Sequence, residues 1–212
     1  MDISPSITKR APLILWLKEY WPALLMLLAF FGFISKSLFQ YPIGIMAILG
    51  IISICKNPRL VLQDNLLKSY CLIFMAIWIP MLISTIDAYH MERSLRTTMG
   101  YLRFLFAGFF IIQALAEKPT RINFVTNGIA FMVSFWVIDA TIQFFIGVDL
   151  FGYPEIPGHI AGMFYPELQL PHICSILAAF LLLFIYQNIN KSWWPFLLLL
   201  PLFFIIFVAG RR

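Results

Sequence analysis

Residues 122–146, INFVTNGIAFMVSFWVIDATIQFFI, decide the fold class of this chain. The stretch contains a single charged residue, Asp139. As an α-helix with a rise of about 1.5 Å per residue it extends over ~37 Å, which is more than the roughly 30 Å hydrocarbon core of a bilayer. Lipid cannot satisfy open backbone groups, so such a run is expected to be helical. The stretch therefore predicts a membrane-spanning helix.

The rest of the chain has the same character. Of its 212 residues, 61% are hydrophobic and 12% are charged, whereas soluble domains carry about 45–50% apolar and roughly 25% charged residues. So few charges cannot cover a surface that faces water, which excludes a soluble domain. Strands of a membrane β-barrel alternate between apolar and polar residues, and the uniformly apolar segments here argue against that architecture.

Charges, prolines and glycines bound about seven apolar segments. We therefore expect an all-α polytopic transmembrane helix bundle, with residues 1–212 forming a single transmembrane domain. Lys9, Arg10 and Lys18 precede the first segment, and no small-residue cleavage site follows it, so we interpret this segment as a retained signal anchor. The expected helices are 21–35, 38–55, 68–86, 97–116, 122–146, 171–186 and 194–208, with an external loop at 147–170.

The distribution of lysine and arginine predicts that the N-terminus is cytoplasmic. The loop 147–170 contains no lysine or arginine, which favours an external position for it. Aromatic residues at the predicted cytoplasmic ends of the first and last helices, including Trp21 and Trp194, fit an aromatic belt at the cytoplasmic face. With this topology nine basic residues lie inside: Lys9, Arg10, Lys18, Lys56, Arg59, Lys68, Lys118, Arg121 and Lys191.

Three arginines depart from this charge distribution, because the same topology places them on the outer side. Arg93, Arg96 and Arg103 are spaced by three and seven residues, which puts them on one helical stripe. The stripe descends ~15 Å, from water into the hydrocarbon zone. Guanidinium groups bind phosphate through paired hydrogen bonds, so the stripe is suited to a phosphorylated lipid or a diphosphate. The alternative is that Arg93 and Arg96 only reach for anionic headgroups.

Asp139 and Gln143 are polar residues in the outer part of the 122–146 helix. Their i and i+4 spacing puts both side chains on one face. Asp139 lies ~10 Å from the outer end, at nearly the depth of Arg103, so we expect the two to pair. A pair that only fixes helix packing is as good an interpretation as a catalytic one.

The external segment 148–171, VDLFGYPEIPGHIAGMFYPELQLP, contains four prolines and cannot form one regular helix. Its aromatic residues keep it amphipathic, so we expect it on the outer interface of the membrane. Two carboxylates there are candidates for general acid and base. A histidine in such a loop is either a ligand or simply a solvated residue. The polar residues of the segment and its flank are Asp149, Glu155, His159, Glu167 and His172.

Neither a metal nor another cofactor is expected, and nucleic acid is not an expected partner. The three cysteines, Cys55, Cys71 and Cys174, lack the spacing of a metal site and lie in or beside apolar runs. In such surroundings a thiol acts as a small hydrophobic group.

Three stretches of the chain carry a family resemblance. Asp139-Ala-Thr-Ile-Gln143 leads into Val148-Asp-Leu-Phe-Gly-Tyr-Pro154, His159-Ile-Ala-Gly-Met-Phe-Tyr-Pro-Glu-Leu168 follows, and Ala209-Gly-Arg-Arg212 comes last. In this order they resemble the O-antigen ligase and polymerase superfamily of membrane glycosyltransferases. Its members carry an Asp-x-x-x-Gln helix with a Phe-Gly turn, then Arg-(Val/Ile)-Ser-Gly-Phe-Phe-Gly-x-Glu-Leu, then Thr-Gly-Ser-Arg-Gly-Ala. The chain matches the N-terminal half of a typical member.

The resemblance implies a function at the periplasmic face of the bacterial inner membrane. Members move a glycan, without a metal, from undecaprenyl diphosphate to a lipid A–core sugar or to a growing glycan. By resemblance Arg212 would contact the diphosphate and stabilise the charge that develops on the leaving group. The same anion would be bound by Arg93, Arg96, Arg103 and Arg211, and the supporting residues would be Asp139, Gln143, His159 and Glu167.

The chain also departs from the family pattern. His159 stands where members have arginine, Ala161 replaces a serine, and Arg211 replaces the serine before Arg212. The large external loop that holds the family's catalytic histidine does not occur in these 212 residues. We therefore expect an N-terminal fragment that is inactive alone. Two alternatives remain open: a transporter or flippase whose path is lined by Arg103 and Asp139, and a noncatalytic membrane subunit.

Overall fold

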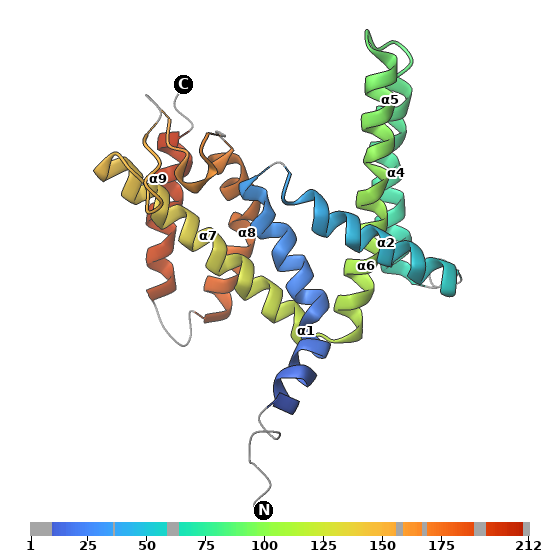
Figure 1. The fold of residues 1–212 in the computed structure, drawn as a ribbon, viewed down its shortest axis with the longest axis horizontal. Coiled ribbons are helices and arrows are strands. Elements are labelled where there is room, and N and C mark those ends of the chain that lie inside the picture. Colours follow the sequence, from blue (N-terminus) through green and yellow to red (C-terminus); the bar gives the residue numbers. More distant parts are fainter. Residues whose placement is uncertain are drawn as a thin grey trace, which may run out of the picture. The chain divides into compact units, whose positions relative to one another are not determined.

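The structure, a computed structural model, describes residues 10–35, 37–58, 64–155, 159–166, 169–188 and 194–209. Within these ranges every regular element is a helix, which confirms the predicted all-α class (Figure 1). The α-helices are α1 (Arg10–Phe31), α2 (Gln40–Lys56), α4 (Asn65–Ser84), α5 (Met91–Gly100), α6 (Leu102–Glu117), α7 (Thr120–Ile146), α8 (Leu170–Asn188) and α9 (Leu199–Ala209). Short 3₁₀ turns occur at η1 (Gly32–Ile34), η2 (Gly162–Phe164) and η3 (Trp194–Leu198).

Five helical segments are long and apolar enough to cross a membrane, so the chain has the architecture of a multi-pass membrane protein. Two shorter apolar helices, Gln40–Lys56 and Pro195–Val208, accompany them. The five candidate spans are Leu13–Ile34, Asn65–Ser84, Met91–Glu117, Thr120–Ile146 and Leu170–Asn188.

Two helices begin earlier than the apolar runs predicted. The first begins at Arg10 instead of residue 21, and Glu19 within it forms an ion pair with Lys118, with 2.8 Å between Oε1 and Nζ. The fourth begins at Met91 instead of residue 97. Both predictions were wrong for the same reason. A prediction from hydropathy ends a helix at the first charged residues. The helix itself can continue through these residues when its backbone hydrogen bonds and contacts permit.

The chain, which we expected to be a single domain, clusters into two compact units. One contains Met1–Ala29 and Gln40–Pro119, and the other contains Phe30–Phe39 and Thr120–Arg212.

In the first unit α2 packs along α6. A Cβ atom added at Gly50 would overlap the carbonyl oxygen of Phe106, so the two backbones are in direct contact there. Further along the same pair of helices, Ser53 Oγ donates a hydrogen bond to Gln113 Oε1. Close approach of helix backbones through a small residue is a common device in membranes, where no hydrophobic effect drives association.

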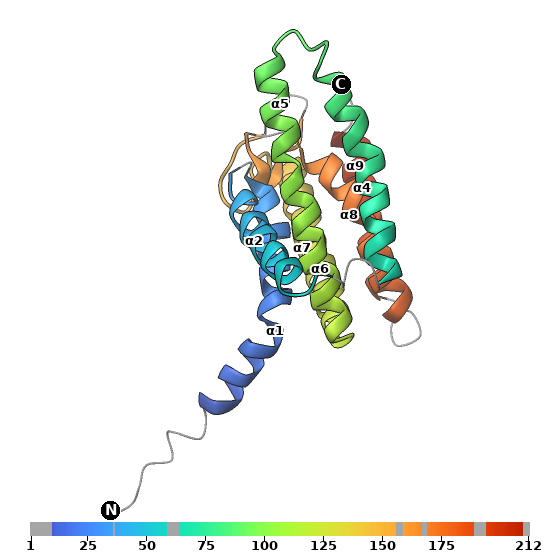
Figure 2. The same ribbon diagram turned by 90° about the vertical axis from the view of Figure 1, so that its right-hand side faces the viewer.

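The helices α4 and α5 form an antiparallel hairpin, which lies side by side in both ribbon views (Figures 1 and 2). Asp64 caps the start of α4 by accepting a hydrogen bond from Leu66 N at 2.8 Å. Trp78 Nε1 then donates to the carbonyl oxygen of Thr98 at 2.9 Å, and Tyr70 Oη donates to that of Phe104 at 2.8 Å. The break between α5 and α6 falls between these two carbonyls. Side chains that bind into the backbone ladder of a helix are a known cause of such breaks.

In the second unit α7 packs against α8 and α9, and the segment after α7 folds back onto it. Trp136 of α7 is almost fully buried, and its ring contacts Phe164 edge to face at 5.1 Å between centroids. Phe144 contacts Phe204 of α9 in the same way at 5.0 Å. The buried face of α7 therefore supports both the neighbouring helices and the segment that follows it.

Candidate functional site

The candidate site in the second unit is built on Asp139 and Gln143, both of which are fully buried on α7. Their side chains contact the same segment, the stretch that runs from Gly147 to the start of α8. This is the arrangement that their i and i+4 spacing predicts.

Both carboxylate oxygens of Asp139 accept backbone N–H groups from this segment. Oδ1 accepts from Leu150 N and Oδ2 accepts from Met163 N, each at 2.9 Å. Such charge-assisted bonds are stronger than bonds between neutral groups. The pairing of Asp139 with Arg103, which belongs to the other unit, stays a prediction.

Gln143 uses both ends of its amide. Its Oε1 accepts from Ala161 N at 3.1 Å and from Gly162 N at 2.8 Å. Its Nε2 lies 3.3 Å from the carbonyl oxygens of both Tyr153 and Pro154. One side chain therefore fastens two separate parts of the segment to α7.

Asp149 orders the first part of the segment. Its Oδ1 accepts from Phe151 N at 2.9 Å and from Tyr153 N at 2.7 Å, the pattern of a turn held by an aspartate side chain. The turn closes with a single antiparallel bridge between Val148 and Pro154. The other oxygen of Asp149 is buried and has no hydrogen-bond partner among the described atoms.

Gly162 is required where the segment meets Asp139. Its φ of +52° lies in the left-handed region, and an added Cβ would lie 3.0 Å from Asp139 Oδ2. A side chain would be strained by the backbone conformation and crowded by the carboxylate. The next turn places Phe164, which is fully buried, against Trp136.

The other predicted residues of this region are less defined. His159 is partly buried in the segment. Glu167, Arg211 and Arg212 lie outside the described residues.

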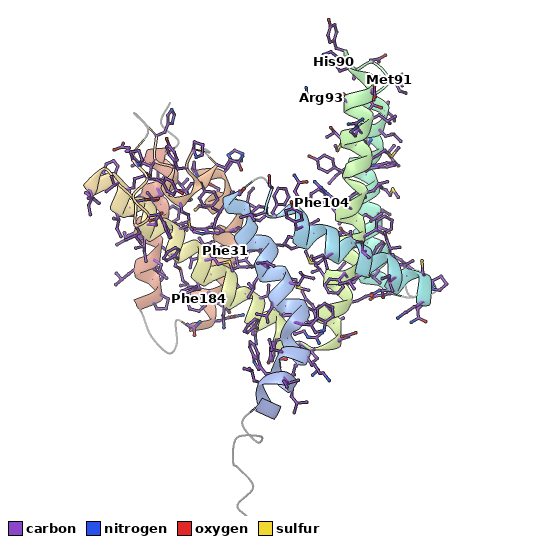
Figure 3. All side chains as sticks on the ribbon, viewed as in Figure 1. Phe31, His90, Met91, Arg93, Phe104 and Phe184 are labelled. Carbon is purple, nitrogen blue, oxygen red and sulfur yellow. The ribbon has the colours of Figure 1, made fainter. Side chains whose placement is uncertain are left out.

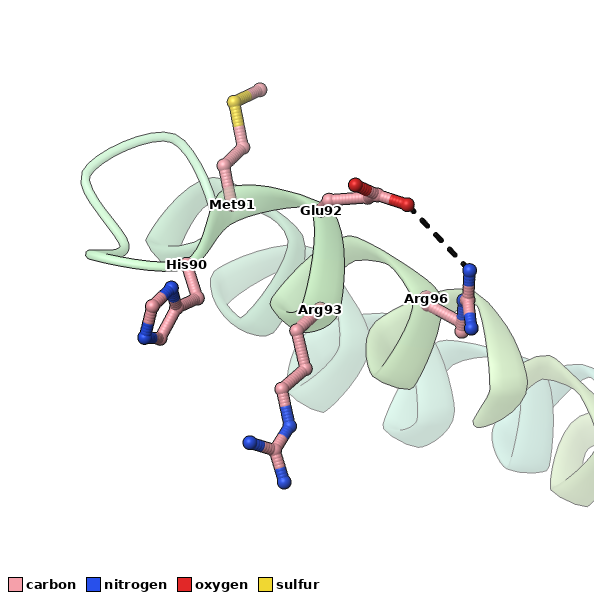
Figure 4. Close-up of a pocket in the computed structure, with 5 residues that line it drawn as sticks. All are labelled: His90, Met91, Glu92, Arg93 and Arg96. Atoms are coloured by element: carbon pink, nitrogen blue, oxygen red, sulfur yellow. Dashed lines mark ion pairs between the residues drawn. The ribbon is translucent and has the colours of Figure 1, made fainter.

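In the first unit, Arg93 and Arg96 line one hollow of about 490 Å³ at the tip of the α4–α5 hairpin. His90, Met91 and Glu92 complete its lining (Figure 4). Arg96 lies 3.5 Å from Glu92, but both side chains are highly exposed, so this ion pair contributes little to stability. Arg93 extends away from that pair, on the side of His90 (Figure 4). Our sequence interpretation missed His90, although its i and i+3 spacing to Arg93 could have indicated it.

Arg103 does not line this hollow. Its Nη1 donates to Gln40 Oε1 of α2 at 3.0 Å, and its guanidinium lies 5.0 Å from the centre of the Phe104 ring. Its Nε is buried and finds no acceptor among the described residues. Figure 3 shows Arg93, with His90 and Met91, at the hairpin tip, whereas Phe104 lies further along toward α2. The structure therefore brings two of the three arginines together and gives the third a contact between α2 and α6.

Among the described residues, no three His, Cys, Asp or Glu side chains come together as a group that could hold a metal ion. Cys55 is exposed, Cys71 is partly buried and Cys174 is fully buried.

No family model matches this chain, and no curated protein and no solved structure matches it either.

Proposed function

We propose that this chain is the membrane-embedded part of an O-antigen ligase-like glycosyltransferase. That enzyme, of which this chain is one part, would move a glycan from undecaprenyl diphosphate to a lipid A–core acceptor at the periplasmic face of the bacterial inner membrane. The observation that carries the proposal is that two stretches with the family resemblance bind each other. Asp139 and Gln143 accept the backbone N–H groups of Ala161, Gly162 and Met163.

These contacts explain why such a pattern needs its particular residue types. An aspartate and a glutamine one helical turn apart present two acceptor oxygens, Asp139 Oδ2 and Gln143 Oε1, to three successive N–H groups. The glycine of the second stretch avoids the steric conflict that any side chain would create beside the carboxylate. The pattern is thus a device that holds a loop on a helix, which leaves the chemistry to groups presented by the loop and by the arginines.

The hollow of Arg93 and Arg96 supports the same proposal from the other unit. Two guanidiniums on one helix turn supply several donors in the planar arrangement that phosphate oxygens accept. Arg93 and Arg96 are therefore our candidates for binding the phosphates of the carrier lipid. The role of Arg212, with Arg211 beside it in the sequence, in stabilising the charge on the leaving group is proposed from the family resemblance alone. The transporter alternative has less support, because both oxygens of Asp139 are already engaged by backbone groups.

Binding of the carrier lipid tests the diphosphate site without requiring turnover. The purified chain is expected to bind undecaprenyl diphosphate, and Arg93→Gln with Arg96→Gln should weaken binding at least tenfold, because each charge-assisted contact is worth about 1.5–3 kcal/mol. Lys68→Gln is the matched control, since Lys68 carries the same charge at the opposite end of α4. Equal affinity of the double variant and the wild type, measured by native mass spectrometry, would remove these arginines from the site.

Glycan transfer tests the enzyme itself. In bacteria that make lipopolysaccharide with the full-length enzyme, Arg212→Ala in that enzyme is expected to abolish the ladder of O-antigen-bearing lipopolysaccharide on a gel. Removing one charge stabiliser of this kind typically costs 10²–10³ in rate, an order-of-magnitude expectation of about 3–4 kcal/mol. Arg212→Lys should restore part of the ladder. A normal ladder from the alanine variant would show that Arg212 has no such role.

A further inference from the structure

A second hollow, of about 320 Å³, lies between the end of α4 and α5. Arg93 lines this hollow as well as the one at the hairpin tip. Unlike the first, it is rich in hydroxyl groups, which come from both helices: Ser84, Thr85, Ser94, Thr97 and Thr98.

Three of these hydroxyls have already committed their hydrogen. Ser84 donates to the carbonyl oxygen of Met81 at 2.8 Å, and Thr85 donates to that of Leu82 at 2.7 Å. Thr97 donates to the carbonyl oxygen of Arg93 at 2.9 Å. A hydroxyl has one hydrogen and two lone pairs, so each of these oxygens can only accept a further bond. The hollow therefore offers acceptors to whatever enters it.

At one end of the hollow, Arg93 supplies hydrogen-bond donors in place of acceptors. Its guanidinium has five N–H donors and no acceptor. Within the described residues it forms no ion pair, in contrast to Arg96. A matching ligand therefore carries an anionic group for Arg93 and, next to it, hydrogen-bond donors for the hydroxyl oxygens.

The location of the hollow narrows the class of ligand. Ser84 is the last residue of α4, which is a candidate membrane span, so the hollow lies where such a span meets the headgroup region. Arg93 and Thr97 are separated by one helical turn, ~6 Å along the axis. A phosphate and an ammonium group joined by two carbons, each with its own hydrogen bond, can cover this separation.

We propose that this hollow binds the phosphoethanolamine headgroup of a membrane phospholipid. The phosphate accepts from Arg93, and the ammonium donates to the hydroxyl oxygens of Ser84, Thr85 and Thr97. A choline headgroup has the same phosphate and the same charge but no N–H donor, so the site discriminates against it. The inference goes beyond glycan transfer and does not rest on it. Arg93 lines both hollows, so it is shared with the proposed diphosphate site, and the hydroxyl variants, which keep Arg93, test this inference separately.

Native mass spectrometry of the purified full chain tests the proposal, with phosphatidylethanolamine, phosphatidylcholine and phosphatidylglycerol of identical acyl chains. Phosphatidylethanolamine is expected to be retained several-fold more than phosphatidylcholine. Ser84→Ala combined with Thr97→Val should reduce its retention to the level of phosphatidylcholine. Arg93→Gln should lower the retention of all three lipids, because all three contain the phosphate.

Two control variants keep the result interpretable if a variant folds poorly. Ser69→Ala removes a hydroxyl that donates to the carbonyl oxygen of Asn65 at the other end of α4, and it should leave lipid retention unchanged. Thr97→Ser keeps the acceptor oxygen and should keep the preference for phosphatidylethanolamine. Free phosphoethanolamine in excess should displace the bound lipid, since the site recognises the headgroup.

Three results would overturn the proposal. Equal retention of phosphatidylethanolamine and phosphatidylcholine would show that the hydroxyls play no part. A preference for phosphatidylglycerol would indicate a general anion site. Failure of free phosphoethanolamine to compete would show that the acyl chains, and not the headgroup, are bound.

Discussion

Replacing Gln143 with leucine is expected to release the segment between Gly147 and Pro166 from α7. Leucine fills a similar volume but removes the acceptor of two buried N–H groups, those of Ala161 and Gly162, and the donor to two carbonyls. A buried polar group left without a partner costs about 1–3 kcal/mol, so the two N–H groups alone are expected to cost about 2–6 kcal/mol. Few other single side chains of the described chain hold so many backbone groups.

Hydrogen exchange followed by mass spectrometry measures this release directly. Peptides that cover residues 159–166 should exchange markedly faster in Gln143→Leu, and the thermal unfolding midpoint should fall. Thr141→Val is the matched control, because the Thr141 hydroxyl bonds only to the carbonyl oxygen of Val137 within the same helix. Unchanged exchange in the leucine variant would mean that the amide does not anchor the segment.

A second substitution at the same position separates the two parts of the anchor. Gln143→Glu keeps an acceptor for Ala161 and Gly162 but replaces the donor to Tyr153 and Pro154 with a carboxylate oxygen. Exchange around residue 161 should then stay slow, while the turn that contains residues 153–154 loosens.

Gly50→Ala is expected to be the most disruptive small substitution in the first unit. The new methyl group would overlap the carbonyl oxygen of Phe106 and lie 2.9 Å from its carbonyl carbon, so a backbone has to move. Overpacking of this kind costs about 1–3 kcal/mol, and a clash with backbone belongs at the upper end of that range. Separation of α2 from α6 should also weaken the Ser53–Gln113 and Arg103–Gln40 contacts.

Gly44→Ala supplies the control within the same helix. An added Cβ at Gly44 meets no described atom within 4 Å, and alanine in a helix interior is favoured over glycine by about 0.5–1 kcal/mol. Thermal unfolding in detergent should therefore show a lower midpoint for the variant at position 50 and an unchanged or higher one for that at position 44. Equal midpoints would refute the close contact between α2 and α6.

The helices themselves were accessible from sequence, because hydropathy alone located the apolar runs that became α2, α4, α7 and α8. Their ends were less accessible where charged residues continue a helix. The helix α5 begins at Met91 although its first turns are polar. Trp78 of α4 donates a hydrogen bond to the carbonyl oxygen of Thr98 and so joins α5 to α4. Such a contact between residues 20 positions apart has no local signature in the sequence.

The candidate site shows a similar division. The spacing of Asp139 and Gln143 predicted one shared face, and their burial on α7 agrees with it. Their partners were not predictable, because both side chains bind main-chain groups, which every residue possesses. The arginine stripe gave the converse result. Arg93 and Arg96 line the same hollow, whereas Arg103 binds Gln40, a residue from a different helix that spacing along one helix cannot reveal.

The anchoring of the segment after α7 by its main chain has a consequence for how such proteins diversify. Because Asp139 and Gln143 bind N–H and carbonyl groups, much of the course of the segment is determined by the helix. Apart from Asp149, Gly162 and Phe164, which shape or bury parts of the segment, its exposed side chains can be replaced without loss of these contacts. The helix can thus keep the path of the segment while the exposed side chains of the segment change.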